Sequence, residues 1–327
     1  MLKILINSNS GGKIMKNKIK ISTYLNDSNP TYVDLFMGDV GDEKRFLDLY
    51  TIIYTSSKDE AFEFKERIIK KVESYFKELL KAIKTNNEEK LNYLSKYIHE
   101  AKYTKIGFSK TGPGKGFGSE KFLNLVKAIR NSIAFKSNKI NDILDIELYT
   151  TNVGVDIISD LITNLIQDVL GEYTEKKLNK LIQADKIRYV EMHYWNENSD
   201  MWKKKKIATV AYKTTLINKE YNYLLIPYCF TANQNQKQKI IGKIFNECVF
   251  EKFKKIILDD EDTYSKFIKP TKNSKKVLKK DMVNFLNENF GDNTAKKGNG
   301  YLTSKGLLDL VERYDDIKYY IENNIKR

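Results

Sequence analysis

The sequence predicts an α+β (or α/β) fold, with a small central mixed sheet flanked by helices and a helical C-terminal region. Long stretches keep apolar residues at helical spacing, and several short stretches are rich in Ile, Val, Thr and Tyr. From about residue 236 to the end, helical spacing dominates again. We therefore expect an α/β core over residues 1–235 and a basic helical domain over residues 236–327.

The N-terminal part is expected to hold two strands and then two helices. Ile, Thr, Tyr and Val are frequent in residues 18–25 and 32–37, which predicts two strands joined by a turn. Apolar residues at helical spacing predict a long helix over about 62–83 and a second helix over about 88–100.

The middle of the chain alternates between predicted strands and helices. Short strands are expected at 103–108 and 146–150, a helix at 120–135, and a further helix from Asp156 onward. Three more stretches read as strands because they are rich in β-branched and aromatic residues, namely 187–195, 207–212 and 221–228.

The balance of charge favours an anionic partner. Lys and Arg number 57 against 43 acidic residues, a net charge of +14, and phosphate neutralisation dominates nucleic-acid binding. A generally lysine-rich composition explains the same numbers without a partner. Two Cys and two His exclude a disulfide scaffold and a multi-histidine metal centre. A metal would depend on carboxylates, which suit Mg²⁺ or Mn²⁺.

Nothing in the sequence predicts a membrane segment. No stretch of about 18 apolar residues occurs, and the first residues lack the apolar core of a secretory signal. We expect a cytoplasmic protein without membrane contact. The sequence leaves open whether translation starts at Met1 or Met15.

The most specific local feature is the pair Asp156 and Asp160. Four residues apart, they share one face of a predicted helix that follows a predicted strand, and together they are suited to hold a hard cation. In the alternative interpretation Asp156 only caps the helix, at a gain of about 1 kcal/mol. Glu100, at a predicted helix end, is a candidate metal ligand or general base.

A glycine-rich loop and two groups of lysines are candidate phosphate contacts. The loop at 110–119 precedes a predicted helix, but it matches neither the Walker nor the dinucleotide-binding pattern. It is either a backbone contact for nucleic acid, through Lys110 and Lys115, or a structural turn. Lysines near aromatic residues suit base stacking with phosphate contact, and the alternative is a solvated charged face. They are Lys203 and Lys204 in one group, and Lys275, Lys276, Lys279 and Lys280 in the other.

The order of several motifs resembles an uncharacterised group of bacterial proteins linked to restriction and phage-defence loci. The motifs are His99-Glu100, the glycine-rich loop, the helix start at 154–164 and the strand at 223–227, spread over about half of the chain. The aspartate at the predicted strand end also resembles the PD-(D/E)XK nucleases. Two departures stand out, because Val155 replaces a proline and Tyr228 replaces a lysine.

The resemblance implies a metal-dependent nuclease. Asp156 and Asp160 would bind Mg²⁺ or Mn²⁺, Glu100 or Glu147 would complete the shell, and Lys213 would face the scissile phosphate in place of the missing lysine. The main alternative is a non-catalytic subunit that binds nucleic acid or another defence-system subunit. A nucleotide sensor that uses the glycine loop is a third reading.

Overall fold

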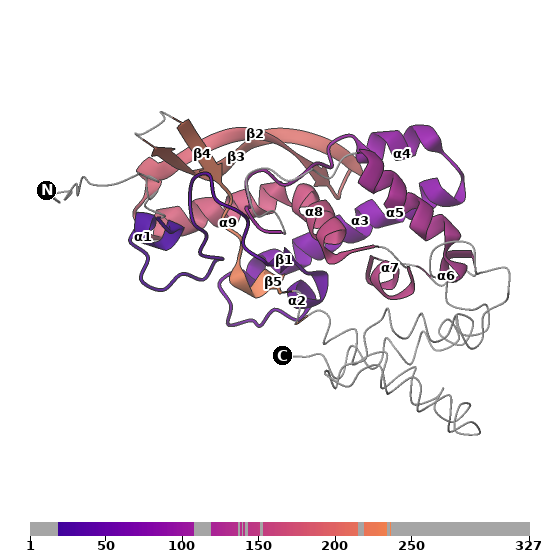
Figure 1. Cartoon of the computed structure of the whole chain (residues 1–327), viewed down its shortest axis with the longest axis horizontal. Coiled ribbons are helices and arrows are strands. Elements are labelled where there is room, and N and C mark those ends of the chain that lie inside the picture. The colour runs from indigo at the N-terminus through magenta and orange to yellow at the C-terminus, as the bar shows by residue number, and fades with distance from the viewer. Residues whose placement is uncertain are drawn as a thin grey trace, which may run out of the picture.

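The computed structural model describes residues 19–107, 119–136, 138, 140, 143–150, 153–214, 219–233 and 236. The expected C-terminal domain over 236–327 lies outside these residues, apart from Gln236. Helices and antiparallel sheets make up the described part, so the chain has the predicted α+β fold. Figure 1 shows the larger sheet along one side of the molecule, with the helices beneath it.

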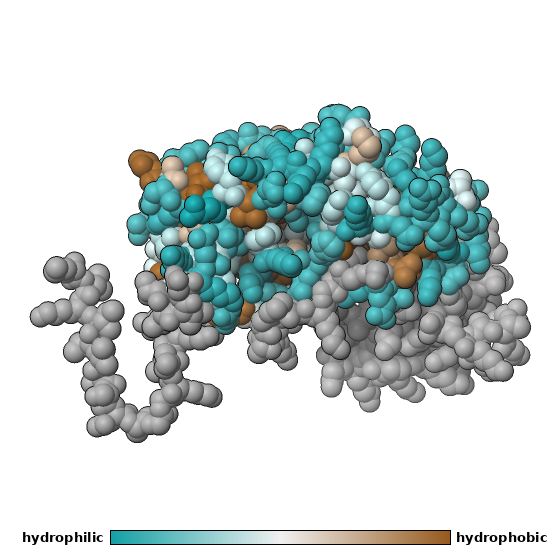
Figure 2. All heavy atoms as spheres, turned by 90° about the horizontal axis from the view of Figure 1, so that it is seen from above, coloured by the Kyte–Doolittle hydropathy of each residue, from teal (hydrophilic) through white to brown (hydrophobic). Residues whose placement is uncertain are grey.

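The larger sheet is an antiparallel meander. Strands β2 (Ile187–Asn196), β3 (Met201–Thr214) and β4 (Lys219–Tyr223) pair in that order, with Trp195 opposite Trp202 next to the first turn. The three strands predicted here are confirmed, although β3 begins at Met201 and the pairing is antiparallel where a mixed sheet was expected. The outer side of this sheet is mainly hydrophilic (Figure 2), as alternating strands covered on one face require.

Helix α9 (Gln167–Lys180) packs against β2 and β3. The contact is close because Gly171 has no side chain: a Cβ there would lie 2.3 Å from Ile207 Cγ2. Before it comes α8 (Val155–Leu165), whose buried face joins α9 to the core. The sheet therefore covers α9, and α8 lies deeper in the molecule.

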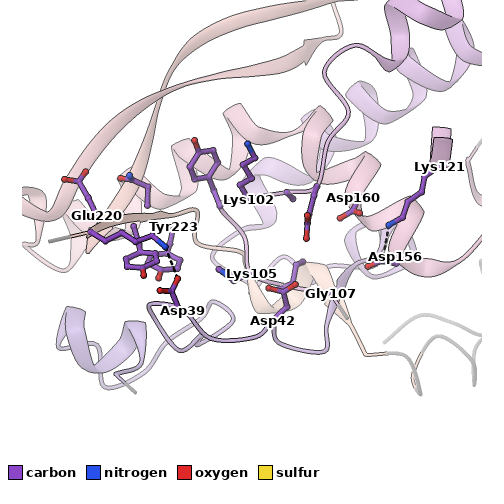
Figure 3. Close-up of a pocket in the computed structure, with 17 residues that line it drawn as sticks. Asp39, Asp42, Lys102, Lys105, Gly107, Lys121, Asp156, Asp160, Glu220 and Tyr223 are labelled. Carbon is purple, nitrogen blue, oxygen red and sulfur yellow. Dashed lines mark hydrogen bonds and ion pairs between the residues drawn. The ribbon is translucent and has the colours of Figure 1, made fainter. Parts of the chain in front are cut away.

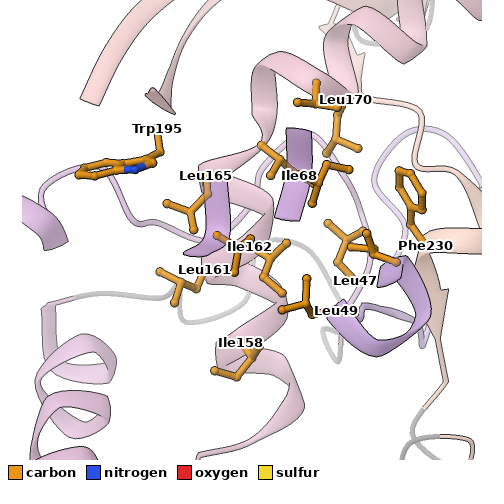
Figure 4. Packing of buried hydrophobic residues seen from close by; sticks show 14 of the residues in the cluster. Leu47, Leu49, Ile68, Ile158, Leu161, Ile162, Leu165, Leu170, Trp195 and Phe230 are labelled. Carbon is orange, nitrogen blue, oxygen red and sulfur yellow. The ribbon is translucent and has the colours of Figure 1, made fainter. Parts of the chain in front are cut away.

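The long helix α3 (Lys65–Lys84) is the centre of the core, and α4 (Glu88–Ser95) packs against it. Both confirm the sequence prediction, as do α5 (Ser119–Asn131) and α6 (Ile133–Lys136), which follow the glycine-rich loop. Figure 4 shows Ile68 of α3 among apolar side chains from other elements, all of them buried. They are Leu47, Leu49, Leu161, Ile162, Leu165, Leu170 and Phe230.

Four predicted strands are wrong. Residues 18–25 contain the helix α1 (Ile21–Leu25), and 146–150 falls in the helix α7 (Ile143–Tyr149). In both cases two buried residues at helical spacing decide the structure, with Ile21 and Leu25 in α1 and Ile143 and Ile146 in α7. Residues 32–37 and 103–108 are irregular chain held by isolated bridges, as far as they are described.

The remaining elements are short. A second sheet pairs β1 (Phe46–Leu47) with β5 (Thr231–Ala232), and α2 (Leu49–Ile53) follows β1. Three short 3₁₀ turns complete the described chain, at Phe62–Phe64, Ala184–Lys186 and Tyr228–Phe230. No helix in the described ranges is long and apolar enough to cross a membrane.

Candidate functional site

A cleft of about 760 Å³ opens between the start of α8, the start of α5, β4 and two irregular segments of the N-terminal half. Carboxylates and lysines line it together, and Figure 3 shows Lys121 reaching toward Asp156, with Lys102 and Lys105 on the side toward Tyr223. The acidic side chains discussed below are Asp42, Glu100, Asp156 and Asp160, and the basic ones are Lys102, Lys105, Lys121 and Lys219.

Helix α8 carries the aspartate pair into this cleft. Asp156 and Asp160 are one turn apart, and Ile158, Leu161 and Ile162 fill the buried face of the helix. The N-terminal cap of α8 is Gly154, and Asp156 lies inside the first turn. The interpretation of Asp156 as a helix cap is therefore wrong, and its carboxylate is left for the cleft.

Asp160 is a buried carboxyl group on a polar cleft. The residue is only 9% exposed, and its side chain makes no hydrogen bond or ion pair with any other described residue. Burial, together with the nearby carboxylates Asp156, Glu100 and Asp42 and against the opposing charge of Lys121, raises the pKa of Asp160 to about 8. Asp160 therefore holds a proton at neutral pH.

Asp156 is in a different environment. Its Oδ2 lies 3.6 Å from Nζ of Lys121, and its side chain is 30% exposed (Figure 3). Lys121 comes from the first turn of α5, directly after the glycine-rich loop. One carboxyl group of the pair is thus protonated and buried, and the other is ion-paired and open to the cleft.

Gly107 brings a third carboxylate to the pair. A Cβ at this position would lie 3.3 Å from Asp156 Oδ1 and 3.6 Å from Asp42 Oδ2, so both carboxylates face the same backbone. Gly107 has a φ of +138°, which other residues rarely adopt. Its N–H donates to the carbonyl of Glu43 (2.9 Å), which places Asp42 beside the start of α8.

Two further hydrogen bonds fix the walls of the cleft on α8. The N–H of Leu47 donates to Ser159 Oγ (3.0 Å), which holds the chain after Asp42 against the helix. Asn164 Nδ2 donates to the carbonyl of His99 (2.6 Å), which places Glu100 at the edge of the cleft. Neighbouring polar residues of α8 thus act as anchors for the segments that carry the other carboxylates.

The structure brings some of the predicted site residues together and leaves others apart. Asp156, Asp160 and Glu100 line one cleft, as the sequence predicted. Glu147 lies on α7, and its side chain is outside the described ones. Lys213 is an exposed residue of β3 that does not line the cleft, and Lys219 of β4 lines it instead.

The predicted nucleic-acid lysines are only partly described. Lys203 and Lys204 are exposed on β3, and Lys204 forms an ion pair with Glu191 at 2.7 Å. The others lie outside the described residues, namely Lys110, Lys115, Lys275, Lys276, Lys279 and Lys280. Tyr228, where the resembling proteins have a lysine, is exposed outside the cleft, and the guanidinium of Arg45 lies 4.0 Å from its ring.

A metal centre is not formed by the described residues. Within them, no group of three or more His, Cys, Asp or Glu side chains is arranged to hold a metal ion. The predicted Mg²⁺ or Mn²⁺ therefore lacks a complete set of ligands in this part of the chain, and it stays a prediction.

Sequence reasoning missed Asp42, Lys121 and the turn at 101–107. No periodic pattern links these segments to α8, because backbone hydrogen bonds and tertiary packing bring them there. A weak signal was present in the sequence, since Tyr103 stands between Lys102 and Lys105 just before a glycine.

Fold and site together define an α+β protein with a polar cleft whose walls carry a buried and an ion-paired carboxyl group. The chain belongs to the family described as domain of unknown function (DUF8370), whose model matches residues 32–237. That stretch contains every residue that lines the cleft. No curated protein and no solved structure matches the chain.

Proposed function

We propose that the chain hydrolyses phosphodiester bonds of a nucleic acid in this cleft, with Asp160 as proton donor and Asp156 as proton acceptor. One observation carries the proposal: two carboxyl groups one helical turn apart open on the same cleft, one buried without a side-chain partner among the described residues and the other ion-paired. Environments that separate two carboxyl groups in this way assign them the acid and the base roles.

The reaction balances with the chain's own residues. The Asp156 carboxylate takes a proton from a water molecule, whose oxygen forms the new bond to phosphorus. Asp160 gives its proton to the oxygen of the leaving nucleotide as the P–O bond breaks. Asp156 then returns its proton to Asp160 through water in the cleft. Lys121 lines the same cleft beside Asp156 and stabilises negative charge on the phosphoryl oxygens.

The nucleic-acid target rests on charge. The whole chain carries a net charge of +14, and exposed Lys203 on β3 is one of its positive charges. Such a surface attracts phosphate backbones, with an affinity that falls as salt rises. The lysines of the cleft supply the same attraction at the site of cleavage.

A second candidate is the metal-dependent form of the same reaction. The observation in its favour is that Asp42 and Asp156 both face Gly107, with Asp160 one turn away. Two carboxylates that face one point suit a hard cation. The described residues supply no third ligand in place, so we derive no step through a metal.

The test is a cleavage assay on labelled single-stranded and duplex DNA and RNA. Wild type, Asp160→Asn, Asp156→Asn and, as control, Glu89→Gln on the exposed side of α4 are compared. We expect each cleft variant to lose about 10²–10⁴-fold in rate and the control to match wild type. Cleavage that persists with EDTA supports the acid–base form, and loss with rescue by Mg²⁺ supports the metal form. Binding without any cleavage would leave the non-catalytic subunit as the better reading.

A further inference from the structure

We propose that the turn at residues 101–107 binds a single-stranded nucleic acid, with Tyr103 stacking on a base and Lys102 and Lys105 contacting the neighbouring phosphates. This inference rests on the proposed function, because it names the substrate class of the same cleft. Its binding experiment does not depend on catalysis, so the two can fail separately.

The turn is a rigid part of the cleft wall. The N–H of Leu224, just after β4, donates to the carbonyl of Tyr103 (2.8 Å), and the N–H of Glu43 donates to the carbonyl of Lys105 (2.9 Å). Within the turn, Thr104 Oγ1 donates to the carbonyl of Ala101 (3.1 Å). Bonds to two distant segments hold the backbone in place, so its side chains are presented to a ligand at low entropic cost.

Tyr103 is the aromatic residue on this turn. Its side chain is half-buried and lines the cleft, and it makes no ring contact or hydrogen bond with other described residues. The other two cleft tyrosines are already engaged: Tyr223 accepts a hydrogen bond from the N–H of Gly38 (2.6 Å), and the ammonium of Lys219 lies 4.6 Å from the Tyr221 ring. Tyr103 packs in part against the hydrophobic core, and a base entering the cleft meets the part of the ring that lines it.

The two lysines of the turn are the cleft cations that form no ion pair within the described part of the chain. Among the described residues, neither Lys102 nor Lys105 forms an ion pair, whereas Lys121 pairs with Asp156 and Lys219 pairs with Asp39 at 2.9 Å. A phosphate contact at Lys102 or Lys105 breaks no existing ion pair. Of the lysines that line the cleft, these two can therefore contact a phosphate at the lowest cost in free energy.

The C-terminal end of the turn lies beside the carboxylates of Asp42 and Asp156. Gly107, its last residue, touches the space between Asp42 and Asp156. Figure 3 shows Lys105 on the side of the cleft toward Tyr223, with Asp160 on the other side of Asp42. A strand that stacks on Tyr103 and places a phosphate at Lys105 has its next phosphodiester close to the proposed acid and base.

Single strands fit this arrangement and duplexes do not. A tyrosine on the wall of a concave cleft reaches a base only if the face of that base is exposed, and in a duplex the faces are covered by neighbouring pairs. Stacking is also tolerant of sequence, because every base has an aromatic face. We therefore expect binding that favours single strands and shows little sequence preference.

The first test measures binding of a fluorescent single-stranded oligonucleotide by polarisation, with Asp160→Asn as the parent so that cleavage is slow during the measurement. Tyr103→Ala should weaken binding by between about 5-fold and 150-fold, the range for loss of one stacked base. Tyr103→Phe should bind like the parent. Tyr189→Ala, which removes an exposed tyrosine of β2 outside the cleft, is the matched control.

The second test uses salt. Lys102→Ala and Lys105→Ala should each reduce the slope of log affinity against log salt by about 0.7, the value for one phosphate contact on a single strand. Lys84→Ala, which removes an exposed lysine at the end of α3, should leave the slope unchanged. An unchanged slope in both turn variants would overturn the phosphate contacts.

Three outcomes overturn the proposal. They are wild-type affinity in Tyr103→Ala, equal weakening by Tyr103→Phe and Tyr103→Ala, and duplex affinity equal to or above single-strand affinity. Melting curves of each variant show whether a loss comes from unfolding, and a folded Tyr103→Phe protein keeps the test decisive. Binding with these signatures but without cleavage refutes the hydrolase alone, and cleavage without any effect of Tyr103 refutes this inference alone.

Discussion

Replacing Asp160 by asparagine should make the protein less sensitive to alkaline pH. The amide has the shape of the protonated carboxyl group but cannot ionise. In the wild type the folded state keeps the Asp160 proton up to about pH 8, because burial and the neighbouring carboxylates raise its pKa. The unfolded chain releases that proton near its ordinary pKa of 3.8.

Proton linkage gives the sign and the size of the change in the free energy of unfolding with pH. Between the two pKa values the folded state binds more protons than the unfolded state, so the free energy of unfolding falls as pH rises. With pKa values of about 8 and 3.8, the loss between about pH 5 and about pH 9 amounts to roughly 4 kcal/mol. Asp160→Asn lacks this contribution. The free energy of unfolding of Asp160→Asn minus that of wild type should therefore increase by that amount over the same pH interval.

Urea unfolding followed by tryptophan fluorescence measures this difference, because Trp195 and Trp202 are both buried in the folded chain. Curves at the two pH values for wild type and Asp160→Asn give the change directly. Glu89→Gln, which alters an exposed carboxylate, should shift stability equally at both pH values. A stability gap between wild type and Asp160→Asn that does not widen with pH would refute the buried, protonated Asp160.

Three further predictions concern packed residues. Gly107→Ala should lower the cleavage rate and cost about 1–3 kcal/mol of stability, because alanine is strained at its φ; unchanged kinetics and denaturation would contradict this. Gly171→Ala should cost about 1–3 kcal/mol through overlap with Ile207, and a melting temperature like that of wild type would disprove the close packing. Lys71→Met should cost about 1–3 kcal/mol, because it removes one of the two cations paired with buried Asp168, which keeps its ion pair with Arg67, and leaves the carbonyl of Trp195 without its donor. A loss below about 1 kcal/mol in urea unfolding would show that this pair is not a stabilising buried contact.

The predictable part of the site lies on one helix. The spacing of Asp156 and Asp160 places them on one face of α8, and Ile158, Leu161 and Ile162 define the buried apolar face. Both facts follow from helical geometry alone. The sequence does not show how deeply each carboxyl group is buried, because that depends on segments packed from elsewhere, such as the chain around Asp42.

The difference between local pattern and tertiary packing also explains which secondary-structure predictions were wrong. Strands β2, β3 and β4 were predictable because β-branched and aromatic residues cluster in them. In α7 the same residue types are present, but Ile143 and Ile146 bury one helical face near α3, and packing overrides propensity. Irregular segments such as 101–107 carry no periodic pattern that predicts where they lie, since hydrogen bonds to distant backbone fix them.

The most direct test of the account is cleavage and binding of one labelled single-stranded oligonucleotide by wild type and Asp160→Asn. The account predicts that wild type cleaves it and that Asp160→Asn binds it with the same affinity but cleaves about 10²–10⁴-fold more slowly. Absence of cleavage by wild type, with and without Mg²⁺ or Mn²⁺, or cleavage by Asp160→Asn at the wild-type rate, would contradict it.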